Sequence, residues 1–139
     1  MIKRLTVIAI LIALMVSVVQ VVGVSAAPGT DAELEAKWDQ LIKNFNRQNV
    51  AHERVHNWAY IWLAKEKKVS AANKRDVEQH LAVCNSSILT AHSIVARHAG
   101  FTASGKLLNR NLAYNSIKQL ADALRAHAAS IKNMREHMK

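Results

Sequence analysis

The 139-residue sequence contains one cysteine, Cys84, and one proline, Pro28. A single cysteine excludes any disulfide within the chain, so stability must come from packing of apolar side chains or from assembly of copies. With four glycines besides that proline, the chain has few residues that interrupt helices. It also has no segment with the alternation of a β-strand, no low-complexity tract and no clear internal repeat. These absences favour a protein made of long helices.

The longest apolar run lies at the very start of the chain. Lys3 and Arg4 precede a mostly apolar segment at residues 5–19, and small residues follow at 25–27. This order is typical of a secretory signal peptide. The sequence therefore predicts a signal peptide at residues 1–26, a helical-bundle domain at 27–139 and a secreted, extracellular protein. The alternative is an uncleaved N-terminal helix that anchors the protein in a membrane, since residues 5–22 approach the length of a membrane span.

The protein carries an excess of positive charge. Its formal net charge is +9 at pH 7, and loss of Lys3 and Arg4 with the leader would lower it to +7. Basic soluble proteins tend to bind nucleic acid, glycosaminoglycan, anionic lipid or acidic proteins. The alternative reading is that the charge only keeps the protein dispersed.

Three segments repeat apolar residues at spacings of three and four, which predicts three helices with one buried face each. The connections between them are short, so neighbouring helices should run antiparallel. The predicted fold class is an all-α, antiparallel bundle of three long helices after the N-terminal signal-peptide helix. Because the apolar period is close to 3.5, the packing should resemble a coiled coil.

The first helix should open at Thr30, because Thr30 and Glu33 have the spacing of a capping box. It should end near Lys67. Asparagines weaken its middle, and a break near Asn46 would turn the bundle into four helices.

The second and third helices are bounded by glycines. Asn73 is the expected N-cap of the second helix. Gly100 should end it, with Phe101 placed for the apolar contact of a Schellman-type stop. The third helix should start near Ser104, with leucines at 107, 108 and 112 holding the core. Its apolar stripe farther along includes one polar member, His127.

Lysines and arginines gather around the first turn and at the C-terminal end of the third helix. An antiparallel bundle brings these two places to one end, here called the basic pole. The pole consists of Lys65, Lys67, Lys68, Lys74, Arg75, Lys132, Arg135 and Lys139, and all but the last are the expected anion contacts. Such a cluster can bind a polyanion with salt-sensitive affinity. The alternative is that the helix dipole favours cations at helix C-termini.

The string His52-Glu53-Arg54-Val55-His56 has the form HExxH. On a helix the two histidines lie one turn apart and can bind zinc together, while the glutamate polarises a bound water. Over these five residues the chain resembles the zincin metalloproteases. The resemblance implies His52 and His56 as zinc ligands, Glu53 as the catalytic general base and a glutamate such as Glu78 as third ligand. The sequence lacks the longer form of the motif, with its glycine and third histidine.

A second metal hypothesis rests on bundle geometry. His52/His56 and His80/Cys84 are pairs spaced four apart, and at 1.5 Å per residue both lie about 12–20 Å from the first turn. Three imidazoles and a thiolate are credible ligands for zinc or copper. The simpler interpretation, which we prefer, is that there is no resident cofactor. In that case Cys84 is a small buried apolar residue, and an intermolecular disulfide is its alternative role.

Two further features concern the surface. Trp58, Tyr60 and Trp62 cannot all lie on one helix face, so Trp62 should face the seam and Trp58 or Tyr60 the edge or outside. They form either a bulky core layer or an exposed apolar patch for a partner or lipid. Asn85 begins an N-glycosylation acceptor sequence, which a eukaryotic producer could use.

Together these features predict a secreted, basic, non-enzymatic binding or effector protein. Its expected partner is an anionic polymer, an anionic surface or an acidic protein. Sequence-specific nucleic-acid binding is not expected, because no aromatic residues are interleaved with the basic pole. The alternatives are a small zinc metalloprotease or metal-binding bundle, and a carrier of apolar ligands or a self-assembling homo-oligomer.

Overall fold

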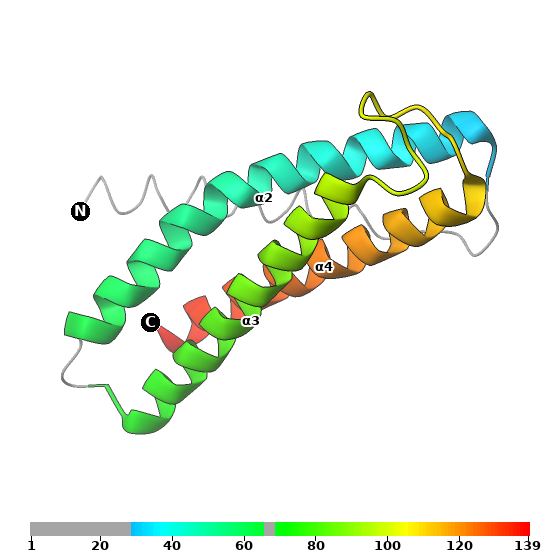
Figure 1. The fold of residues 1–139 in the computed structure, drawn as a ribbon. Coiled ribbons are helices and arrows are strands. Elements are labelled where there is room, and N and C mark those ends of the chain that lie inside the picture. The colour runs from blue at the N-terminus through cyan, green and yellow to red at the C-terminus, as the bar shows by residue number, and fades with distance from the viewer. Residues whose placement is uncertain (1–28, 66–68) are drawn as a thin grey trace.

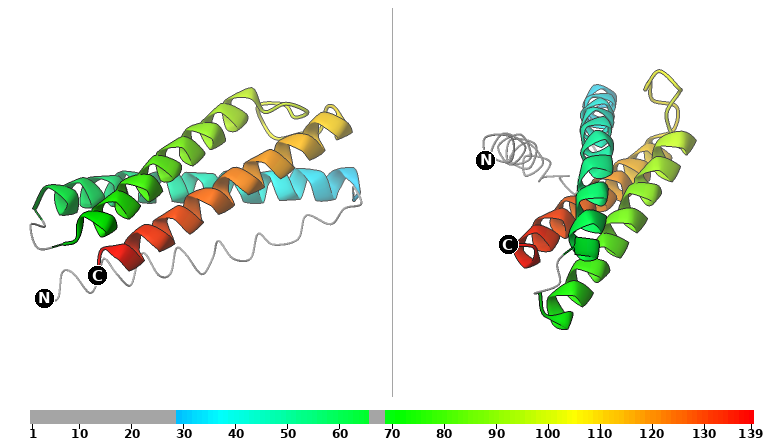
Figure 2. Two further views of the ribbon diagram at one scale, coloured as in Figure 1. Left: turned by 90° about the horizontal axis from the view of Figure 1, so that it is seen from below. Right: turned by 90° about the vertical axis from the view of Figure 1, so that its left-hand side faces the viewer.

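The computed structural model describes residues 29–65 and 69–139, which form three helices. These are α2 (Asp31–Lys65), α3 (Ala71–Arg97) and α4 (Arg110–His137). They pack side by side along their lengths, and α3 runs opposite to α2 and α4 (Figures 1 and 2). The predicted all-helical bundle is thereby confirmed. The signal peptide predicted at residues 1–26 lies outside the described residues.

Helix α2 continues through its asparagines without a break, so the four-helix alternative is wrong. Asn44 is buried, and its Oδ1 atom accepts a long hydrogen bond of 3.5 Å from Gln48 Nε2. Asn49 Oδ1 lies 2.7 Å from Nε2 of His92 on α3. The burial of Asn44 and the contact of Asn49 with α3 outweigh the low intrinsic helix propensity of asparagine, because packing supplies most of the stability of helices in proteins.

The starts of the first two helices are fixed by side-chain caps. The backbone N–H of Thr30 donates to Glu33 Oε2 at 2.7 Å, and the N–H of Glu33 donates to Thr30 Oγ1 at 3.3 Å. The predicted capping box is therefore confirmed. The N-cap of α3 is Ser70 and not Asn73 as predicted, because Ser70 Oγ accepts the backbone N–H of Asn73 at 3.2 Å.

This difference leads to a first testable prediction. Replacing Ser70 with alanine should lower the free energy of unfolding by about 1 kcal/mol, because the Asn73 N–H loses its acceptor. Replacing Asn73 with alanine should change it by less than about 0.5 kcal/mol, since its side chain caps nothing. Urea unfolding of both variants measures the two changes. A larger loss in the Asn73 variant would show that the helix begins later than Ala71.

Helix α4 begins at Arg110, several residues after the predicted start near Ser104. Its N-cap is Asn109, whose Oδ1 accepts the backbone N–H of Leu112 at 3.0 Å. An asparagine side chain is a strong helix N-cap, because it satisfies a free backbone donor. The residues before it form a loop.

That loop folds back onto the bundle. Gly100 has a φ of +90°, and its carbonyl oxygen accepts the backbone N–H of Leu108 at 2.8 Å. Phe101 is 1% exposed and stacks on Trp38 of α2, with ring centroids 4.7 Å apart. Leu107 is partly buried against the same cluster. Leu108 and Leu112 are exposed, so they do not hold the core as predicted.

The core consists of two apolar clusters, one toward each end of the bundle. The first includes Trp38, Phe45, Phe101 and Leu124, and the second includes Val55, Val77, Cys84, Ile131 and Met138. Between them, at mid-height of the three helices, lies a set of mostly buried polar residues. This polar layer consists of Gln48, His52, Ser87, His127 and Ser130, with Cys84 at its border.

Candidate functional site

The basic pole lies where α2 ends, α3 begins and α4 ends (Figures 1 and 2). Apolar contacts fix this arrangement. Met138, just after α4, is buried in one cluster with Val77 of α3, and Trp62 of α2 packs against that cluster. Each of these residues lies within about one helical turn of a basic residue of the pole. The fold therefore brings together the two stretches of basic sequence that the prediction required to meet.

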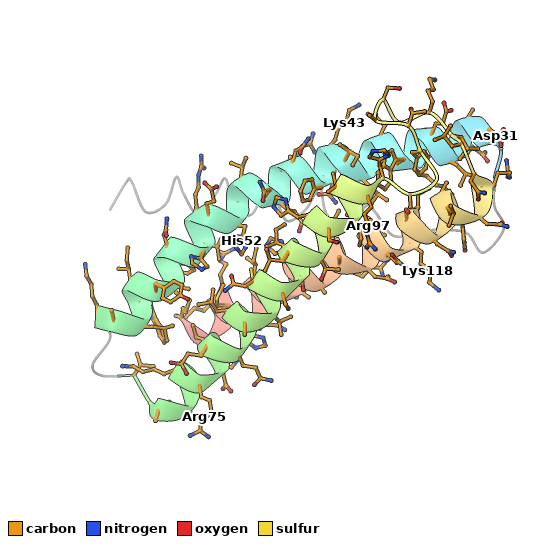
Figure 3. The ribbon with its side chains drawn as sticks, in the orientation of Figure 1. Asp31, Lys43, His52, Arg75, Arg97 and Lys118 are labelled. Carbon is orange, nitrogen blue, oxygen red and sulfur yellow. The ribbon has the colours of Figure 1, made fainter. Side chains whose placement is uncertain are left out.

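The pole residues that the structure describes present their charges to solvent. Lys65, Arg75, Lys132 and Lys139 are exposed, and Lys74 and Arg135 are half-buried. Arg75 projects from the start of α3 away from the other helices (Figure 3). Lys67 and Lys68 lie outside the described residues.

The pairing of charges differs between the two ends of the bundle. The described residues contain four ion pairs between a carboxylate and a lysine or arginine, all away from the pole: Asp39–Lys43, Glu35–Lys106, Asp31–Arg110 and Asp122–Arg125. Within the same residues, no lysine or arginine of the pole is in such a pair. The pole's Asp76 instead lies 3.7 Å from His137. Three basic residues at the opposite end, Lys43, Lys106 and Arg110, are thus paired with carboxylates, whereas no described basic residue of the pole is.

The polar layer brings together three potential metal ligands, one from each helix. His52 Nδ1 of α2 lies 3.1 Å from His127 Nε2 of α4 and 3.5 Å from Cys84 Sγ of α3. The three ligand atoms all lie within 4.8 Å of one another. Cys84 and His127 are 0% exposed, whereas His52 is partly exposed at mid-length of α2 (Figure 3).

Gln48 orients the imidazole of His127. The Nδ1 atom of His127 lies 2.6 Å from Gln48 Oε1, which can only accept a hydrogen bond. His127 Nδ1 must therefore carry the hydrogen, and Nε2 of the neutral ring presents a lone pair toward His52. Such a bond from the far ring nitrogen is what orients histidine ligands in metal sites.

Burial keeps the three groups uncharged at neutral pH. Desolvation, with a smaller contribution from His52, lowers the pKa of His127 to about 4. Desolvation, followed by repulsion from His56, lowers the pKa of His52. Desolvation raises the pKa of the Cys84 thiol to about 11, against the opposite effect of a hydrogen bond with Ser130. The metal-free layer therefore holds two neutral imidazoles and a thiol.

The other predicted metal residues lie outside this group. The half-buried His56 has its ring centroid 5.6 Å from that of His52 and 4.6 Å from that of Tyr60. The ring of His80 lies against His137, with centroids 5.6 Å apart. Glu53 and Glu78 are exposed. Of the four predicted ligands, the structure thus groups His52 with Cys84 and adds His127.

His127 could have been found in the sequence. It is the polar member of the apolar stripe predicted for the third helix, and a histidine on a buried stripe needs a polar partner. The sequence does not show which residues of the other two helices lie level with His127, because that depends on where α4 starts.

Three other predicted features differ in how deeply they are buried. They are the aromatic residues of α2, the glycosylation sequence at Asn85 and the thiol of Cys84. Trp58 and Tyr60 are 40% and 52% exposed, and Trp62 is partly buried against the core, which agrees with the expected arrangement. Asn85 is half-buried in the middle of α3. Cys84 is a free, buried thiol, so a disulfide to another chain would require α3 to move.

No known protein family, curated protein or solved structure matches the chain. Among the described residues, none of the helices is both long and apolar enough to cross a membrane. The basic pole and the polar layer are therefore the two features from which function can be inferred.

Proposed function

We propose that this is a secreted, non-enzymatic binding protein whose basic pole binds an anionic polymer. The observation that carries the proposal is the distribution of ion pairs. The described lysines and arginines of the pole are in no ion pair with a carboxylate, whereas three at the opposite end of the bundle, Lys43, Lys106 and Arg110, are. Unpaired cations held on rigid helix ends attract anions by long-range and contact interactions.

A row of basic residues on α4 favours a polymer over a small anion. Lys118, Arg125 and Lys132 are spaced seven apart on α4, and Lys139 continues this spacing just beyond the end of the helix at His137. All four are exposed, although Arg125 pairs with Asp122. At 1.5 Å per residue, the three helical members span about 21 Å, and the row ends in the pole. An extended polyanion can contact several members of such a row and the pole at once, whereas a single small anion cannot.

The test is affinity for heparin as a model polyanion. The protein should elute from a heparin column well above physiological salt, because several charge contacts must be screened together. Replacing Arg75, Lys132 and Arg135 with glutamine should weaken binding by about 100-fold, at about 1 kcal/mol for each positive charge removed.

A matched triple variant controls for net charge. Replacing Arg47, Arg54 and Arg97 with glutamine removes the same charge from exposed positions outside the pole. This variant should keep most of the affinity. Elution of the native protein at or below physiological salt would refute the proposal, and so would an equal loss of affinity in the two triple variants.

A further inference from the structure

The polar layer has the composition and geometry of a transition-metal site. His52, Cys84 and His127 converge from three helices, with their ligand atoms within 4.8 Å of one another. We propose that these three side chains bind one monovalent copper ion at the centre of the bundle. This site is separate from the basic pole and does not depend on polyanion binding.

The distances between the ligand atoms suit a shared ion. In a three-coordinate site, bonds of about 2.0–2.1 Å to nitrogen and about 2.3 Å to sulfur place the ligand atoms about 3.5–3.8 Å apart. The observed separations are 3.1 Å between His52 Nδ1 and His127 Nε2 and 3.5 Å between His52 Nδ1 and Cys84 Sγ. The third, between Cys84 and His127, is within 4.8 Å. Side-chain rotations that change these separations by up to about 1 Å would accommodate an ion.

Charge and ligand number favour copper(I) over zinc. One thiolate and two neutral imidazoles balance Cu⁺ completely, whereas Zn²⁺ would leave one uncompensated charge in a buried site, which is costly. Structural zinc takes four ligands, and the group found in the described residues offers three. A soft thiolate beside imidazoles is a ligand set that copper(I) prefers.

The surroundings of the cluster support its ligands. Gln48 Oε1 accepts the Nδ1 hydrogen of His127 at 2.6 Å, which leaves the Nε2 lone pair facing His52. The Ser130 hydroxyl donates its hydrogen to the His127 carbonyl at 2.8 Å. These contacts hold His127 in place on a rigid helix, as a preorganised site requires.

The cluster is closed on one side and reachable on the other. Cys84 and His127 are fully buried, whereas His52 is partly exposed next to the half-buried ring of His56. Copper would thus arrive from the α2 side. When it binds, a Cu–S bond replaces the S–H bond of Cys84, the thiol proton leaves to solvent, and the copper stays monovalent.

The test is a competition for copper(I) under anaerobic, reducing conditions. The protein is titrated into the coloured copper(I)–bicinchoninate complex, and we expect it to withdraw one equivalent of copper. Replacing Cys84 with serine or His127 with glutamine should lower the affinity by about 100-fold or more. Replacing His80 with glutamine, which changes a histidine outside the cluster, should leave it unchanged. X-ray absorption of the copper-loaded native protein should show one sulfur and two nitrogen neighbours.

The absorption measurement uses only the native protein, so the proposal stays testable if a variant fails to fold. Failure of the native protein to withdraw copper would overturn the proposal and leave the cluster as a hydrogen-bonded layer. Equal affinity in the Cys84→Ser variant would also overturn it, as would a copper spectrum without sulfur. Binding of Zn²⁺ in preference to Cu⁺ would reject the assignment to copper.

Discussion

Replacing Gly100 with alanine is expected to destabilise the protein by about 3 kcal/mol or more. Gly100 has a φ of +90°, and a Cβ atom there would lie 2.1 Å from the backbone nitrogen of Ala113. That nitrogen belongs to the first turn of α4, where it donates to the Asn109 carbonyl at 2.9 Å. Relief of the clash would require the loop and the start of α4 to separate. Urea unfolding measures the loss.

Gly105 provides the matched control for this variant. It also has a positive φ, of +83°, but its added Cβ would meet only Cδ1 of the Trp38 side chain, at 3.5 Å. The Gly105→Ala variant should therefore lose about 1 kcal/mol, from backbone conformation alone. Equal losses in the two variants would contradict the proposed close approach of Gly100 to α4.

The helices could be predicted from the sequence because their apolar residues recur at regular intervals. The capping box at Thr30 and the buried stripes are local signals that a sequence contains directly. The start of α4 has a local signal too, since Asn109 caps it, but the choice of Asn109 over Ser104 could not be read from the local pattern. It depends on the loop after Gly100, where Phe101 is held by stacking on Trp38, a residue from a distant helix. Helix boundaries set by such long-range contacts are not visible in local patterns.

The two candidate sites differ in how much of each could be predicted from the sequence. The basic pole follows from the antiparallel order of the helices, so a prediction of topology was enough to bring its two parts together. The polar layer depends on the axial register of three helices, which fixes the height of each histidine. Four ligands were predicted from one pair of helices, whereas the cluster takes its third ligand, His127, from α4.

The polar layer also sets the axial register of the three helices. It separates two apolar clusters, and its buried groups find partners at one alignment of the helices. In that alignment His127 meets Gln48 and His52. Sliding one helix by a turn would bury these groups against apolar side chains without partners, at a cost of about 1–3 kcal/mol for each. The same register places the helix ends that form the basic pole.

Lowering the pH from 6.5 to about 4 is expected to cost the metal-free protein about 3 kcal/mol of stability through His127 alone. In the unfolded chain this imidazole gains its proton near its ordinary pKa of 6.5, whereas burial lowers the pKa to about 4 in the folded protein. Between these values the unfolded state binds more protons, so stability is complete above pH 6.5 and falls as the pH decreases. The lowered pKa of His52 acts in the same direction. Urea unfolding with a chelator present, at several pH values, measures the slope.

Variants separate this effect from the general loss of stability in acid. Glutamine at position 127 cannot be protonated, so the His127→Gln variant should show a much shallower decrease between pH 6.5 and 4, even though it is less stable at neutral pH. The His80→Gln variant changes a histidine outside the polar layer and should keep the native slope. The slopes are compared and not the absolute stabilities, because removing His127 also leaves Gln48 without its partner. If the His127→Gln variant keeps the native slope, the acid sensitivity of the protein arises elsewhere and the imidazole of His127 is not buried in its neutral form.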